Sequence, residues 1–175
     1  MKEKILPTIV LTIICVAAAL LLAFAHEVTK DSIAVQKELK FSKTVEKLFG
    51  DCEIRMLDSS FGCKEIRNIA VTPDGKTAVE IVADGYSKGG IDVLIGFDES
   101  GAVCGIEFVA LGETPGLGSK VSDDKSFREQ FIGASDDSYS FDAISGATFS
   151  SKGMKHAVDT ALKVYNENKE AILNG

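Results

Sequence analysis

The sequence predicts an α+β protein, in which a single N-terminal transmembrane helix precedes a domain with a mainly antiparallel sheet and flanking helices. Three observations predict this class. Residues 5–25 form an uncharged apolar run, the middle of the chain contains short β-prone runs separated by turn residues, and residues 154–165 carry apolar side chains at helical spacing. A chain of 175 residues has room for one domain of ordinary size and a short appendage.

The apolar run is the first element. Ile5 to Ala25 contains 21 residues and no charge, and at about 1.5 Å per residue a helix of this length spans roughly 30 Å, the hydrocarbon thickness of a bilayer. Pro7 is expected in its first turn, where a missing N–H costs little. The alternative is a cleaved signal peptide, because Ala23-Phe24-Ala25 resembles a processing site. The run is longer than the usual core of about 7–15 residues, so we expect residues 1–25 to be a retained membrane anchor.

The lysines on either side of this anchor bear on its orientation. Lys2 and Lys4 flank one end, and four more lie within about 20 residues of the other end: Lys30, Lys37, Lys40 and Lys43. A long C-terminal domain can be exported largely regardless of charge once a short basic tail is held inside. We therefore expect a single-pass protein of the inner or plasma membrane whose domain lies on the extracytoplasmic side.

Composition excludes some function classes. A formal net charge of −7 and a pI near 4.9 argue against nucleic acid as a partner, because such a partner requires a basic surface. Cys15 lies within the membrane segment, and Cys52, Cys63 and Cys104 have no metal-ligand spacing, so no metal site is expected. The sequence leaves open whether Cys52 and Cys63 form a disulfide.

The remaining chain divides into a connector and a domain. From Val28 to Leu48 apolar residues recur at roughly helical spacing, so residues 26–50 are expected to be a helical connector that ends at Gly50. The domain then occupies residues 51–175, and its first stretch, up to Cys63, is expected to be irregular.

Strand signals dominate the middle of the domain. The β-prone runs are Ile66–Val71, Thr77–Ala83, Ile91–Phe97 and Val103–Ala110. Because Asp98-Glu99-Ser100-Gly101 has the length and composition of a hairpin loop, the last two runs are expected to pair antiparallel.

Helices are expected near the C-terminus. A short one is predicted around Phe127 and Phe131, followed by a polar stretch from Ala134 to Ser140. An amphipathic helix of about 18 residues comes last; its apolar positions are Met154, Ala157, Val158, Ala161, Leu162 and Tyr165. Ser150 or Ser151 is expected to cap its N-terminus.

A short motif precedes this last helix. Asp142-Ala143-Ile144-Ser145-Gly146-Ala147-Thr148 places the Thr148 hydroxyl close to free backbone N–H groups and a positive dipole end, which suits a phosphate. A nearby phosphate would also explain Lys152 and Lys155, whose charges are otherwise unfavourable at this end of a helix. The plainer alternative is a turn whose Ser or Thr merely caps the helix.

A second unusual segment is the loop Gly112-Glu113-Thr114-Pro115-Gly116-Leu117-Gly118. Three glycines and a proline within seven residues prevent regular structure. Leu117 nevertheless lies among them as an apolar residue without an evident partner.

With these two segments the sequence resembles the FMN-binding domains of the G subunit of the Rnf ion-translocating ferredoxin oxidoreductase and of the related C subunit of the sodium-pumping NADH:quinone reductase. Asp142-x-x-Ser145-Gly146-Ala147-Thr148 is similar to the family's flavinylation motif, and Glu113–Gly118 is similar to its second flavin-contacting loop. The single membrane helix of the family matches residues 5–25, so the resemblance covers nearly the whole chain.

The resemblance implies that Thr148 bears FMN through a phosphoester bond that a separate flavin transferase makes from FAD. Ser145, Gly146, Ala147 and Lys152 would surround the phosphate. Leu117 would offer an apolar ledge to the ring between Gly116 and Gly118, and Glu113 and Thr114 would bond the ring or the ribityl chain. For Glu113 an exposed loop carboxylate is the alternative.

The resemblance also implies a redox subunit rather than a stand-alone enzyme. The chain has no Rossmann or P-loop motif and no iron–sulfur spacing, so other membrane and redox subunits would meet nicotinamide and ferredoxin. No catalytic residue is expected, because His156 lies two turns into the last helix and is expected on its surface. Two alternatives stay open: the quinone-reductase C subunit, which is longer, and a membrane anchor or assembly protein without flavin.

Overall fold

The computed structural model describes residues 2–57 and 60–174. The elements in chain order are α1 (Lys2–Phe49), β1 (Arg55–Leu57), β2 (Ile66–Val71), β3 (Thr77–Ala83), β4 (Ile91–Phe97), β5 (Val103–Leu111), α2 (Lys120–Asp123), α3 (Lys125–Glu129) and α4 (Thr148–Asn174). The chain divides after Phe41 into two compact units, which are described separately.

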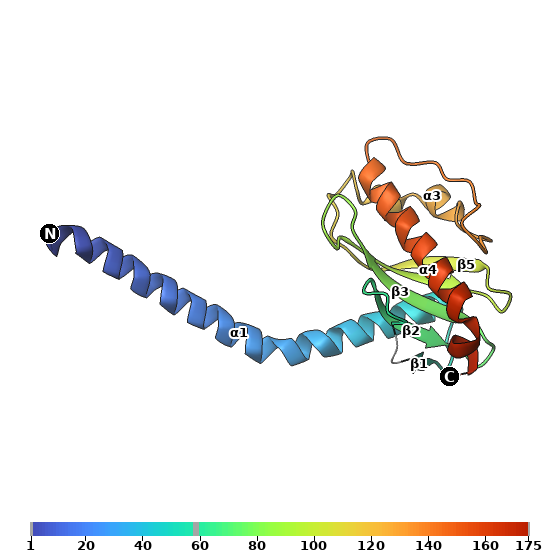
Figure 1. The fold of residues 1–175 in the computed structure, drawn as a ribbon, viewed down its shortest axis with the longest axis horizontal. Helices are drawn as coiled ribbons and strands as arrows, with labels where there is room; N and C mark the ends of the chain where they lie inside the picture. Colours follow the sequence, from blue (N-terminus) through green and yellow to red (C-terminus); the bar gives the residue numbers. More distant parts are fainter. Residues whose placement is uncertain (1, 58–59, 175) are drawn as a thin grey trace. The chain divides into compact units, whose positions relative to one another are not determined.

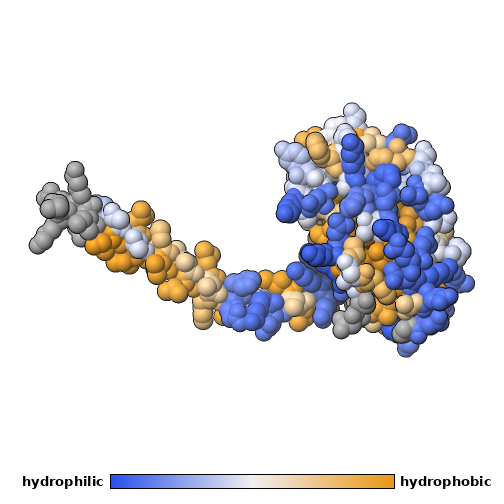
Figure 2. All heavy atoms as spheres, viewed as in Figure 1, coloured by the Kyte–Doolittle hydropathy of each residue, from blue (hydrophilic) through white to orange (hydrophobic). Residues whose placement is uncertain are grey.

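The first unit is the N-terminal part of α1. From Pro7 onward the helix contains a window with a mean hydropathy of 2.8, none of it buried, which is long and apolar enough to cross a membrane. Figure 2 shows apolar side chains gathered along this arm, followed by a polar stretch. The helix begins at Lys2, so Pro7 lies inside it and the expectation of a first-turn proline was wrong. Helix-forming Lys and Glu residues before Ile5 account for the extension.

The second unit is built on a five-stranded meander. The strands follow one another in the order β1-β2-β3-β4-β5, and every neighbouring pair is antiparallel (Figure 1). This confirms the predicted α+β class with an antiparallel sheet. The β4–β5 hairpin closes at Asp98, whose carboxylate accepts backbone hydrogen bonds from Ser100, Gly101 and Ala102.

Helix α4 covers one face of the sheet and packs against β3 and β4. The side chains between them form the core, in which Phe97 and Tyr165 stack with ring centroids 4.5 Å apart. Gly153 brings the helix close to the strand ends, because a Cβ at this position would overlap the carbonyl oxygen of Asp84. The start of α4 is thereby fixed against the loop that follows β3.

The opposite face of the sheet is covered by the last turns of α1, which belong to this second unit. Val45 is buried, and Leu48 lies over a cross-strand pair of glycines, Gly96 of β4 and Gly105 of β5. A Cβ on Gly96 would lie 2.6 Å from a Leu48 methyl carbon. The two glycines thus leave the space that the Leu48 side chain occupies.

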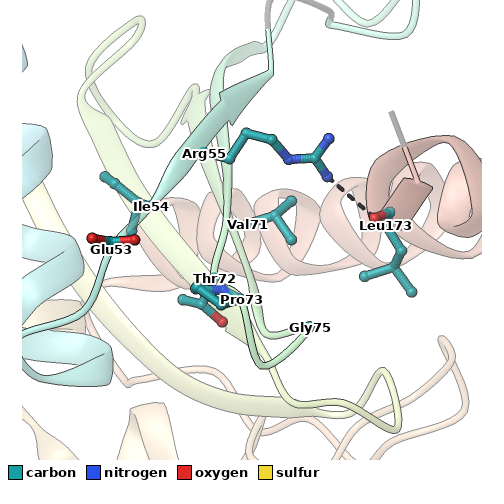
Figure 3. A pocket seen from close by; sticks show the side chains of 8 residues that line it. All are labelled: Glu53, Ile54, Arg55, Val71, Thr72, Pro73, Gly75 and Leu173. Carbon is teal, nitrogen blue, oxygen red and sulfur yellow. Dashed lines mark hydrogen bonds between the residues drawn. The ribbon is translucent and has the colours of Figure 1, made fainter.

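Elements of the second unit also differ from the expectations. β1 lies in a stretch expected to be irregular, and α2 was not expected at all; both are too short for a periodic pattern. Arg55 of β1 donates hydrogen bonds to the carbonyl oxygens of Ile172 and Leu173, at 3.1 and 3.2 Å, and so ties the edge of the sheet to the end of α4 (Figure 3). The last helix runs from Thr148 to Asn174 and, at 27 residues, is longer than expected; it contains a non-helical residue at Asn168.

Candidate functional site

The motif that precedes α4 forms a tight turn. Gly146 has a φ of 81°, a left-handed conformation that glycine adopts without strain. The Ala147 N–H donates to the carbonyl oxygen of Ile144 at 3.0 Å, and the Ile144 N–H donates to the Ser151 hydroxyl at 3.0 Å. Thr148 is therefore the first residue of the helix, with an exposed side chain.

Neither serine caps the helix, so that expectation was wrong. Ser150 and Ser151 are both buried inside the first turn, where Ser151 accepts the hydrogen bond from Ile144 and Ser150 donates to the carboxylate of Glu113. Tertiary partners have therefore replaced the local capping role. Ala147 precedes the helix and has no side-chain oxygen, which leaves the N–H groups of the first turn to another acceptor.

The glycine-rich loop after β5 lies beside this helix start. Gly116 has a φ of 75°, and its N–H donates to the Ser119 hydroxyl at 2.9 Å. The N–H groups of Leu117 and Ser119 both donate to the carbonyl oxygen of Thr114 at 3.2 Å. This folding holds Leu117 outward, where 52% of its surface is exposed.

Glu113 is not the exposed carboxylate that was considered as its alternative. It is 7% exposed, and its carboxylate accepts hydrogen bonds from the N–H groups of Tyr86 (3.1 Å) and Ser87 (2.9 Å) as well as from the Ser150 hydroxyl. It thus lies beneath the surface, at the junction of the loop after β3, its own loop and α4.

These segments enclose a hollow of about 330 Å³, which falls within the usual range for small-molecule sites. Six of the residues singled out by the sequence line it: Thr114, Leu117, Gly118, Gly146, Ala147 and Thr148. The structure therefore brings together the two motifs, which are about 30 residues apart in the chain. Ser145, Gly116 and Lys152 are exposed and outside this lining.

Two aromatic residues of this hollow, Tyr86 and Phe149, were not predicted from the sequence. Their rings pack edge to face with centroids 6.4 Å apart, yet they are 75% and 71% exposed. A signal for Phe149 existed, because an aromatic residue directly after the motif falls outside the apolar stripe of the helix. Together with Leu117 they form an exposed apolar rim of a kind that commonly marks a binding site.

The two lysines of the first helical turns differ. Lys152 is exposed, whereas Lys155 forms an ion pair with Asp159 at 2.7 Å and lies over the ring of Tyr139. Asp159 also accepts a hydrogen bond from the Tyr139 hydroxyl at 2.5 Å; burial, and then this bond, raise the pKa of Tyr139 above its usual range. Lys155 is therefore engaged in holding the loop before the motif, and only Lys152 stays a candidate for a phosphate.

Other features of the domain do not contribute to this hollow. The two other hollows described, of about 500 and 510 Å³, are lined by none of the motif residues; the first is open and lies beside Arg55 and Leu173 (Figure 3). His156 is on the surface, as expected, and contacts Glu65 at 3.0 Å. Within the described residues no cluster suited to a metal ion occurs, and Cys52 and Cys63 are free.

The residues of the hollow fit a flavin mononucleotide. The rim of Tyr86, Leu117 and Phe149 offers apolar surface to a planar ring system. The start of α4, without a capping side chain at Ala147, offers N–H donors and a positive dipole end to a phosphate. Gly118 and Gly146 both line the hollow and have no side chains, which leaves room for the chain between ring and phosphate.

Comparison with known proteins agrees with this fit. The sequence pattern of the FMN-binding domain family matches residues 85–163, a range that begins at the loop after β3 and ends within α4. It includes Tyr86, the glycine-rich loop and Thr148, and therefore the whole lining of the hollow.

Relatives that match almost the full chain are named as the G subunit of an ion-translocating oxidoreductase complex. The protein of Vibrio vulnificus (strain YJ016) is 30% identical over 94% of this chain and 90% of its own length. Those of Aliivibrio fischeri (strain MJ11) and Shewanella amazonensis (strain ATCC BAA-1098 / SB2B) are 27% and 29% identical, over 95% and 93% of this chain and 92% and 86% of theirs. The chain therefore belongs to the family of G subunits of the ion-translocating oxidoreductase complex, with an FMN-binding domain carried behind a helix able to span a membrane.

Proposed function

We propose that this chain is the electron-transfer subunit of a membrane-bound ion-translocating ferredoxin:NAD oxidoreductase, the Rnf complex, and that it relays electrons through FMN joined covalently to Thr148. Family membership and the FMN-binding domain support the electron-transfer role. The relatives are named as G subunits, which favours this assignment over the quinone-reductase C subunit. A membrane anchor without flavin would not require the two motifs to line one hollow.

The observation that carries the covalent attachment is the position of Thr148. Its exposed hydroxyl lies at the first residue of α4 and within the lining of the hollow. A phosphate bonded there would accept hydrogen bonds from the N–H groups of the first turn, and exposed Lys152 is one turn away. The phosphate would thus be held both by a bond and by its surroundings.

The attachment reaction requires another protein. The Thr148 oxygen forms a bond to the FMN phosphorus of FAD, the diphosphate bond breaks, AMP leaves and the hydroxyl proton is released. A threonine hydroxyl is a weak nucleophile without a base, and His156 is turned to Glu65 on the surface. We propose that a flavin transferase supplies the activation.

Within the bound state the chain's own residues would orient the cofactor, which supplies the redox chemistry. Tyr86, Leu117 and Phe149 would contact the ring, Thr114 and Gly116 to Gly118 the ring or the ribityl chain, and Ser145 to Ala147 the phosphate. A covalent bond would keep the cofactor on a domain held outside the cytoplasm, where no flavin pool replaces losses. Electrons would pass to and from other redox subunits of the complex.

The attachment is tested by coexpressing the full chain with its flavin transferase and measuring flavin fluorescence of the denatured protein in a gel. We expect a fluorescent band from the wild type and none from Thr148→Ala. Thr148→Ser keeps a hydroxyl and is expected to keep part of the signal. Thr160→Ala, on the same helix but outside the hollow, is the matched control and should fluoresce like the wild type. Equal fluorescence in Thr148→Ala would refute attachment at this residue.

We further propose that residues 1–25 hold the domain on the extracytoplasmic side. Cys104 has an exposed side chain in the domain, so a membrane-impermeant maleimide applied to spheroplasts should label it. In a chain whose Cys52 and Cys63 are replaced by serine, Cys104→Ser should abolish that label. Labelling only after the membrane is permeabilised would place the domain in the cytoplasm.

A further inference from the structure

Glu113 is the point at which three segments of the flavin hollow meet. Its two oxygens accept hydrogen bonds from the backbone of Tyr86 and Ser87, in the loop after β3, and from the hydroxyl of Ser150, in α4. Each segment also contributes to the lining: Tyr86 from the first, Thr114 and Leu117 from the loop that follows Glu113, and Thr148 to Ser150 from the helix. Glu113 itself is absent from that lining.

The surroundings of this carboxylate are shaped to receive it. A Cβ added at Gly85 would lie 2.7 Å from Oε1, one at Gly90 would lie 2.5 Å from the same atom, and one at Gly118 would lie 2.5 Å from Oε2. Real Cβ atoms do not approach so closely, so a side chain at any of these three glycines would require the carboxylate to move from its present position. The position of Glu113 is therefore defined by close packing as well as by its hydrogen bonds.

All three partners donate into the carboxylate, and two of them are backbone N–H groups that cannot reverse direction. A glutamine at this position would place its NH₂ group against at least one of these donors. An aspartate would be one methylene too short to reach both the loop after β3 and α4. The site therefore requires the two acceptor oxygens of glutamate, at the length of its side chain.

We infer that Glu113 is a positioning residue, which fixes the walls of the hollow relative to Thr148 without touching the cofactor. This inference rests on the proposed function for its consequence, the environment of the flavin. It differs from the role implied by family resemblance, in which Glu113 bonds the ring or the ribityl chain. Loss of the carboxylate should loosen Tyr86, Leu117 and the start of α4 together, because all three walls depend on it.

The first measurement needs no flavin. Amide hydrogen exchange is followed in the full chain for the wild type, Glu113→Gln and the control Glu99→Gln, an exposed carboxylate in the β4–β5 hairpin. We expect exchange in residues 84–90, 112–118 and 146–150 to become at least about tenfold faster in Glu113→Gln, with strands β2 to β4 unchanged. If these three segments of Glu113→Gln exchange as slowly as in the wild type, the inference is overturned, whether or not the protein carries flavin.

The second measurement uses the flavinylated full chain. Glu113→Gln should still carry FMN, but the ring should be quenched about twice as strongly by iodide and the midpoint potential should shift, because the surroundings of the ring change. Wild-type quenching together with a wild-type potential would contradict a positioning role. A wild-type chain without covalent flavin would instead defeat the proposed function, and the exchange result would stand by itself.

Ser150→Ala keeps the inference testable if Glu113→Gln does not fold. It removes the single side-chain donor and leaves both backbone contacts of Glu113 in place. We expect faster exchange in residues 146–150 and a smaller rise in iodide quenching than in Glu113→Gln. If Ser150→Ala behaves like the wild type in both respects, the carboxylate does not hold the helix start and the inference fails.

Discussion

Ser150, in the first turn of α4, donates a hydrogen bond to the carboxylate of Glu113, 37 residues earlier in the chain. The bond is buried and joins the two motifs that line the hollow. It explains why a serine at a helix start is buried rather than acting as a cap. The architecture of the domain leads to further predictions about its stability.

The close approach of α4 to the loop after β3 leaves no space for a side chain at Gly153. Alanine normally stabilises a helix interior by up to about 1 kcal/mol relative to glycine, but here its Cβ would overlap the backbone of Asp84. We expect Gly153→Ala to lower the free energy of unfolding by about 1–3 kcal/mol, measured by urea titration. Gly112→Ala is the control, because its Cβ would meet Gly90 at an ordinary 3.6 Å. A stabilised Gly153→Ala protein would show that the helix is not held against this loop.

The end of α1 belongs to the folded domain. Val45 is buried and Leu48 lies over Gly96 and Gly105, so a fragment of residues 42–175 should unfold cooperatively. A fragment of residues 51–175 should be less stable, since it exposes the sheet face beneath Leu48. Leu48→Ala in the longer fragment should cost about 2 kcal/mol. Equal melting temperatures for the two fragments would contradict this packing.

A pair of buried carboxyl groups should make stability depend on pH. Burial, opposed by a hydrogen bond from Asn68 and aided by neighbouring Asp92, raises the pKa of Glu80 from 4.5 to about 7, and Arg67 pairs with Asp92 at 2.8 Å. The folded state therefore holds a proton that the unfolded state releases between these values. This contribution to stability is complete below about pH 4.5 and is lost as the pH rises through about 7.

The free energy of unfolding should accordingly fall by about 2 kcal/mol between pH 5 and pH 8 on account of this group. Glu80→Gln, which is neutral throughout, should flatten that part of the profile and be more stable than the wild type at pH 8. Urea titrations at several pH values measure both effects. A Glu80→Gln profile parallel to that of the wild type would assign the pH dependence to other groups.

Much of the sheet could be predicted from the sequence, because its strands are long, rich in β-branched residues and bounded by turns. β2, β3 and β4 begin and end at the predicted residues, and β5 extends one residue further, to Leu111. β1 could not be predicted, because three mostly exposed residues have no pattern and owe their conformation to pairing with β2.

Residues of the candidate site could be predicted where they belong to a local motif. Residues that reach the site only through tertiary contacts could not. The two motifs pointed to Thr148 and Leu117, which the structure brings to one hollow. The burial of Glu113 depends on donors from two distant segments, and Tyr86 reaches the hollow only through the fold of the loop after β3. Such partners leave no spacing signal in a single sequence.

The most direct test of covalent attachment is to locate the flavin on the chain. Protein matured with its flavin transferase is digested with trypsin, and the peptide that ends at Lys152 is fragmented by mass spectrometry. We predict that this peptide carries the mass of an FMN phosphoryl group and that the fragments assign it to Thr148. An unmodified peptide, or a flavin assigned to Ser145, Ser150 or Ser151, would contradict attachment at Thr148.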